Sequence, residues 1–167
     1  MRWLLALSLV LVASTARADG DRFVVFGLGT SMAANDPGWA LRVEHRLDAT
    51  RTRAHARGEP LVGGRMGVET WDAGGHWGFA MPMGMYFGGQ VNSMRTTIGG
   101  GIGLWTFERG GGDVHFGISP FASASLEGSV GKLILSLDGR LARQVIAETG
   151  DFNVYSVMLM VGKRFAK

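Results

Sequence analysis

Large apolar residues alternate with small or polar residues along most of the chain beyond residue 20. Between residues 133 and 141, leucine occupies positions 133, 135, 137 and 141, while Ser136, Asp138 and Arg140 lie between them. A period of two places successive side chains on opposite faces of a β-strand. We find no helical period of useful length. The pattern therefore predicts an all-β protein.

Seven segments rich in glycine, asparagine, aspartate and proline interrupt this alternation, as turns between strands do. They leave eight expected strands, at residues 22–32, 39–47, 61–71, 76–87, 96–107, 114–126, 132–145 and 152–165. A length near ten residues is what a tilted strand needs to cross a bilayer. The longest connection, residues 48–60, is basic, and we expect a solvated turn there, with contact to lipid phosphates as the alternative.

The first 18 residues have the three parts of a secretory signal peptide. Arg2 supplies the positive charge, residues 3–13 form an apolar segment, and Ala16-Arg17-Ala18 is a small-x-small cleavage site. The apolar run is too short for a membrane anchor. We expect cleavage between Ala18 and Asp19, which leaves residues 19–167 as one barrel domain. An exported chain without cysteine has neither disulfides nor a site for a lipid anchor.

The composition indicates whether the outer face of the barrel is exposed to water or to lipid. With 27 glycines but 4 prolines and no collagen-like repeat, and with 46% apolar residues, the chain is neither collagen nor disordered. A soluble barrel would carry charges on its outer face, yet residues 96–107 and 114–126 have none on either face. The outer face of a membrane barrel needs none, because it meets lipid. We therefore predict an antiparallel up-and-down eight-stranded transmembrane β-barrel.

Charged residues on the polar faces of the strands are expected to point into the lumen, which side chains just fill in a barrel of eight strands. They comprise four arginines and four acids: Arg42, Glu44, Arg46, Asp48, Arg65, Glu69, Asp138 and Arg140. Buried charges are costly unless they are paired, so the equal numbers predict a structural network of ion pairs. A polar conduit or a gating role is the alternative.

Aromatic residues gather near the two ends of the expected barrel, as they do where membrane barrels cross the interfaces. The aromatic girdle is assigned to Trp39, Trp77 and Tyr155 at one end, and to Phe87 and Phe165 at the other. Six further aromatics lie near the same ends and are expected to extend the two girdles: Trp71, Trp105, Phe107, Phe152, Phe23 and Tyr86. By strict alternation Trp71, Trp105 and Phe107 point into the lumen, unless bulges turn them outward.

The last strand alternates through Tyr155, Val157, Leu159 and Val161 to the near-terminal Phe165. This pattern is similar to the carboxy-terminal signature of bacterial outer-membrane barrels that their assembly machinery reads. In length, strand number and signal peptide the mature chain resembles the small barrels of the OmpA/OmpX type. The resemblance implies an integral protein of the outer membrane of a Gram-negative-type cell, with membrane lipids and the barrel-assembly machinery as partners.

Catalytic and metal sites are not expected. The lipid A deacylase family also uses a small barrel, with a His-x-Ser motif and a nearby glutamate, whereas here His115 and Ser119 are four residues apart, with Glu127 following. Four residues span about 13 Å of strand, too far for the hydroxyl-to-imidazole hydrogen bond that activates a nucleophile. The four histidines lie on separate segments without metal-ligand spacing. We expect neither cofactor nor metal.

Nucleic-acid binding is not expected. Removal of Arg2 and Arg17 with the signal peptide leaves 15 basic and 14 acidic residues, so the mature chain is almost neutral. The sequence thus predicts a non-enzymatic, monomeric outer-membrane barrel with a structural or interaction role and a lumen filled by side chains. Two alternatives stay open. One is a secreted soluble lipocalin-like barrel that binds a small apolar ligand, and the other is a membrane-embedded lipid A-modifying enzyme.

Overall fold

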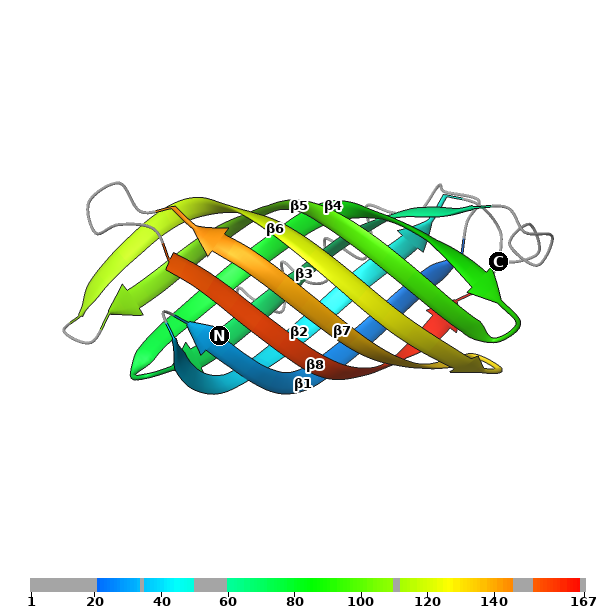
Figure 1. Cartoon of the computed structure of the whole chain (residues 1–167), viewed down its shortest axis with the longest axis horizontal. Helices are drawn as coiled ribbons and strands as arrows, with labels where there is room; N and C mark the ends of the chain where they lie inside the picture. Colours follow the sequence, from blue (N-terminus) through cyan, green and yellow to red (C-terminus); the bar gives the residue numbers. More distant parts are fainter. Residues whose placement is uncertain (1–20, 34, 50–59, 110–111, 146–151, 166–167) are drawn as a thin grey trace.

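The computed structural model describes residues 21–33, 35–49, 60–109, 112–145 and 152–165. They form eight strands, as the alternation predicted, and Figure 1 shows them running obliquely around one barrel. The strands are β1 (Arg22–Ala33), β2 (Asp36–Asp48), β3 (Leu61–Ala73), β4 (His76–Val91), β5 (Met94–Arg109), β6 (Asp113–Val130), β7 (Leu133–Gln144) and β8 (Phe152–Phe165).

Each strand pairs antiparallel with the next, and β1 pairs with β8, so the barrel is closed. Following the paired residues once around the barrel from Arg22 returns to Met32, ten residues further along β1. A stagger of ten residues over eight strands corresponds to a strand tilt of about 40°. Both ends of the described chain lie at one end of the barrel, together with the last residues of β2, β4 and β6 (Figure 1).

Several strands are longer than the sequence pattern predicted, because their turns are tighter. Strand β2 begins at Asp36, so the expected turn residues 36–38 belong to it, and β4 and β6 continue to Val91 and Val130. The turn residues Asn35 and Asn92 have positive φ angles of 77° and 55°. Asparagine tolerates this left-handed conformation, which two-residue hairpin turns require. Most of the basic connection at 48–60 lies outside the described residues.

The outer face of the barrel is apolar. On β8 the outward residues Val157, Leu159 and Val161 are exposed, and on β6 Phe116 is 78% exposed. The buried inward positions include most of the strand charges. This is the reverse of a soluble protein, in which charges face water. Within the described residues no helix is long and apolar enough to span a bilayer.

Inward-facing aromatics are seated on glycines of the neighbouring strand. Trp71 lies over Gly78 and Trp105 over Gly117, where a Cβ atom on either glycine would come within 2.2 Å and 2.8 Å of the indole. Tyr86 covers Gly63 in the same way. The absence of a glycine side chain therefore makes room for each ring inside a narrow barrel.

The aromatic girdle is smaller than the full set of aromatics near the two ends. Trp71, Trp105 and Phe107 are buried in the lumen, as strict alternation requires, and no bulge turns them outward. Phe23 and Tyr86 are also buried inside, so assigning them to the interface was wrong. The five assigned girdle residues are exposed on the outer surface: Trp39, Trp77, Phe87, Tyr155 and Phe165. The Phe152 side chain is outside the described residues.

A charge placed on the outer face tests which side meets lipid. Leu159 is 67% exposed in the middle of β8, whereas Val130 is exposed at the end of β6. We expect Leu159→Arg to lower the free energy of unfolding by about 2–4 kcal/mol, and Val130→Arg by about 0–1 kcal/mol, because the penalty depends on depth in the bilayer. Urea titration in phospholipid vesicles measures both. Equal effects of the two variants would contradict a lipid-facing outer surface.

Candidate functional site

The lumen holds the densest group of charged side chains in the described part of the chain. Alternate positions of β2 direct Arg42, Glu44, Arg46 and Asp48 inward, and all four are buried. The remaining predicted lumen charges, on β3 and β7, are buried as well: Arg65, Glu69, Asp138 and Arg140. We call these eight residues, together with Arg95 on β5 and Glu127 on β6, the lumen charge network.

Asp138 lies at the centre of the lumen charge network and is fully buried. Its Oδ1 accepts a hydrogen bond from Nη1 of Arg42. Its Oδ2 lies 3.4 Å from Nη2 of Arg46 and 3.3 Å from Nη1 of Arg65. One carboxylate on β7 thus binds three guanidinium groups from β2 and β3.

On the side of Asp138 toward the β1–β2 turn, two arginines share one glutamate. Arg42 Nε and Arg140 Nη1 donate to the same Glu69 oxygen over 3.0 Å and 2.8 Å. Arg140 Nη2 donates to Glu44 over 2.7 Å, and Arg42 Nη2 to the hydroxyl of Ser156 over 2.9 Å. These bonds join β2, β3, β7 and β8 across the lumen.

On the side toward the chain termini, the network includes two charges that the sequence analysis did not place in the lumen. Arg95 donates to Asp48 over 2.8 Å, and the Tyr86 hydroxyl donates to the same oxygen over 2.6 Å. Glu127 accepts from Nη1 of Arg46 and lies 3.6 Å from Arg95. Asp48 therefore joins the other predicted charges through Arg95 and Glu127.

Arg95 and Glu127 were missed because each lies one residue outside an expected strand, 96–107 or 114–126. Arg95 shares its face with Thr97, and Glu127 shares its face with Ser125, and all four side chains are buried. Extending the alternation by one residue at each strand end would have found both. With them, the lumen charge network contains five arginines and five acids.

Aromatic rings lie over two guanidinium groups that also form ion pairs. The guanidinium of Arg95 lies 4.7 Å from the ring centre of Phe23, and that of Arg140 lies 4.7 Å from the ring centre of Phe121. Arginine over a ring is stabilised by the negative face of the ring, most strongly where water is excluded. The rings thus help to stabilise the buried positive charge.

The opposite end of the lumen, beyond Glu69, contains a cluster of rings around Phe107. Trp71 stacks on Phe107 with ring centres 5.6 Å apart, and Trp105 lies at 6.0 Å. His76 and His115 approach Phe107 to 5.5 Å and 6.4 Å. We call these five residues the aromatic cap.

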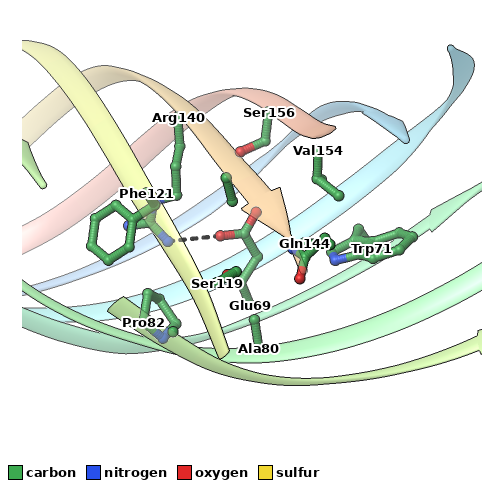
Figure 2. A pocket seen from close by; sticks show the side chains of 12 residues that line it. Glu69, Trp71, Ala80, Pro82, Ser119, Phe121, Arg140, Gln144, Val154 and Ser156 are labelled. Atoms are coloured by element: carbon green, nitrogen blue, oxygen red, sulfur yellow. Dashed lines mark hydrogen bonds and ion pairs between the residues drawn. The ribbon is translucent and has the colours of Figure 1, made fainter. Parts of the chain in front are cut away.

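A small cavity remains between the aromatic cap and the lumen charge network. Figure 2 shows it between the Arg140–Glu69 ion pair and the side chains of Trp71 and Gln144. Its volume is about 20 Å³, which accommodates roughly one water molecule. The buried Oε1 atom of Gln144 has no hydrogen-bond partner among the described residues.

The residues considered for catalysis are separated in the structure. His115 belongs to the aromatic cap, Ser119 lines the cavity, and Glu127 is held by Arg46 and Arg95 in the lumen charge network. Nor do the described residues contain a group of three histidine, aspartate or glutamate side chains that could hold a metal ion. The expected cleavage site, Ala18 and Asp19, lies outside the described residues.

Comparison with known proteins gives a fold but no sequence family. No protein-family model and no curated protein matches the chain. Among solved structures, Neisserial surface protein A (NspA) matches with a TM-score of 0.66 and 12% identity, covering 87% of this chain and 97% of that one. The fold is that of the small eight-stranded outer-membrane barrels.

Two further solved structures show the same fold. Ail, the attachment invasion locus protein of Yersinia pestis, has a TM-score of 0.56 and 13% identity, covering 88% of this chain and 99% of that one. The outer membrane enzyme PagL has a TM-score of 0.54 and 15% identity, covering 84% and 97%. Because these small barrels differ in function, the function of this chain must be argued from its own residues.

Removal of the central carboxylate tests the lumen charge network. We expect Asp138→Asn to lower the free energy of unfolding by about 3–5 kcal/mol, because three buried guanidinium groups lose their shared anion. The matched control is Asp72→Asn on the outer face of β3, with an expected change within about 0.5 kcal/mol. Urea unfolding of both variants in detergent measures the difference. A small change for Asp138→Asn would mean that water reaches the network.

Proposed function

We propose that this protein is an integral outer-membrane barrel with a lumen closed by ion pairs, and that it acts through its surface as a structural or interaction protein. The observation that carries this proposal is the reversed polarity of the barrel. Its outer face is apolar, and its inner face buries five arginines and five acids. Such a surface is stable in lipid and unstable in water.

The same polarity argues against a soluble barrel that binds an apolar ligand. A lipocalin-like site needs an apolar interior cavity that is large enough for the ligand. Here charged side chains fill the middle of the lumen, and the cavity beside Gln144 has room for about one water molecule.

Two features support a closed lumen rather than a pore. The guanidinium and carboxylate groups bind one another across the lumen, from β2 to β6 and β7, instead of lining its wall. The aromatic cap occupies the end beyond Glu69. An ion entering this lumen would have to break several buried ion pairs, each of which is costly to separate.

A non-catalytic role is supported by the positions of His115, Ser119 and Glu127. The histidine and serine are about 13 Å apart along β6, which is beyond hydrogen-bond reach. Glu127 binds two arginines and is therefore committed to the lumen charge network. The likeness to PagL concerns the fold, and these residues do not form a nucleophile–base pair.

Export and orientation complete the proposal. Residues 1–18 act as a cleaved signal peptide, and residues 19–167 are inserted by the barrel-assembly machinery as a monomer. An even number of strands places both chain ends on one side. We assign that side to the periplasm, from which an exported chain enters the outer membrane.

Cell fractionation tests the location. We expect the mature protein to begin at Asp19, to sediment with the outer membrane and to resist extraction with high salt, because apolar burial in lipid is insensitive to ionic strength. N-terminal sequencing and immunoblotting of the fractions measure this. Recovery in the soluble periplasm without detergent would overturn the proposal.

Electrical recording tests the closed lumen. Purified wild-type protein in a planar bilayer is expected to give no steady single-channel current. Asp138→Asn, if it folds, is expected to give brief openings, because its arginines lose their shared partner. Large steady currents from the wild type would show that the lumen charge network lines a conducting path.

A further inference from the structure

A shallow groove indents the outer surface over β2, β3 and β4, on the half of the barrel that carries the chain termini. It has a volume of about 260 Å³, and its outer-face lining residues are His45, Leu47, Gly64, Met66 and Met83. Gly64 forms its floor, because a Cβ atom there would meet nothing closer than a carbonyl oxygen 3.9 Å away. The groove is thus an apolar depression in a surface that we assign to lipid.

Two cationic side chains, Arg22 and Lys163, lie beside this groove on the outer face, close to His45, which lines it. Val24 of β1 pairs with His45 on one side and with Lys163 of β8 on the other, so both flank it on the same face. Arg22 lies on the same face two residues before Val24, close enough to interact electrostatically with His45. Adjacent strands are about 4.8 Å apart, so the long side chains of Arg22 and Lys163 can reach one ligand.

Among the described residues, no acidic side chain on the outer face lies near Arg22, His45 and Lys163. Nε and Nη2 of Arg22 are buried, and they have no hydrogen-bond partner among the described residues. The outward-facing acids Asp72 and Glu108 lie at the other end of the barrel, and Asp21 is buried on the inner side. Lys163 is held over the ring of Phe165, 5.6 Å from its centre, at the level of the aromatic girdle.

From this arrangement we infer that the groove binds one anionic glycerophospholipid, with its phosphate at Arg22, His45 and Lys163 and an acyl chain over Gly64. Charge complementarity selects the headgroup, since arginine donates charge-assisted hydrogen bonds to phosphate oxygens. The groove accommodates an acyl chain of the lipid, because glycine at its floor has no side chain and its walls are methionine and leucine. Methionine adapts readily to an irregular apolar surface.

The inference rests on the proposed membrane location. It adds that the protein binds a specific lipid of the leaflet in which the terminus end of the barrel lies. The stagger of the barrel places Met66 and Met83 further from the terminus end than Arg22 and Lys163, because paired residues move away from that end from β8 through β1 to β4. A phosphate at the interface and a chain in the hydrocarbon layer would fit this order.

Native mass spectrometry of the detergent-purified mature protein tests this site. The protein is incubated with dioleoyl phosphatidylglycerol or with the zwitterionic dioleoyl phosphatidylcholine, and the fraction that retains one lipid is measured. We expect the wild type to retain more phosphatidylglycerol, and this preference to fall about fivefold for each basic residue removed in Arg22→Gln and Lys163→Gln. The control Arg143→Gln, on the outer face at the end opposite the chain termini, is expected to keep the preference for phosphatidylglycerol.

A matched pair of glycine variants tests the groove. Gly64→Leu fills it, whereas Gly139→Leu adds the same side chain on β7, where a Cβ atom likewise has 3.9 Å of clearance. We expect Gly64→Leu to lose most of the retained phosphatidylglycerol and Gly139→Leu to retain it. Circular dichroism checks that both variants are folded.

Two results would overturn the inference. The first is equal retention of both lipids by the wild type, and the second is equal retention of phosphatidylglycerol by the two leucine variants. Either result, in a protein that needs detergent, would leave the membrane location intact. A wild-type protein that is soluble and monomeric without detergent would instead overturn the proposed function itself.

Discussion

The hydrogen bonds between β1 and β8 are the contact on which the rest of the structure depends. An open sheet would leave a row of N–H and C=O groups without partners, and in a lipid environment each such group costs several kcal/mol. Closure removes both edges at once. The stagger of ten residues at which β1 meets β8 also sets the tilt of the strands and so the width of the lumen.

A narrow lumen makes the lumen charge network and the barrel wall dependent on each other. Water is largely excluded, so the guanidinium and carboxylate groups must be stabilised by one another and by nearby rings. Their ion pairs connect strands that are not neighbours in the sheet, such as β2 with β6 and β3 with β7. The backbone hydrogen bonds hold the strands side by side, and the ion pairs connect opposite walls.

Alternation, together with the turn segments and the uncharged outer faces, was sufficient to predict the strand number, the closed antiparallel fold and the face of each predicted lumen charge. Alternation could not assign the ion-pair partners. The pairing of Asp138 with Arg42, Arg46 and Arg65 depends on the stagger of the strands around the barrel, which a local sequence pattern does not determine. Alternation failed for Arg95 and Glu127, since turn residues near strand ends hid the last step of the alternation. Phe23 and Tyr86 were misassigned because position near an end was used in place of parity.

The glycines opposite large inward side chains have a further consequence. Gly63, Gly78 and Gly117 each lie under an aromatic ring, and Gly27 lies under Met160 in the same manner. Because the lumen has a fixed width, each such pair of neighbouring inward residues must keep its combined side-chain volume. The identity of either residue alone is less constrained. Homologous sequences should therefore change these positions two at a time, with a small residue moving to one strand as a large one moves to the other. Compensated exchanges of this kind would keep the lumen filled while its chemistry changed.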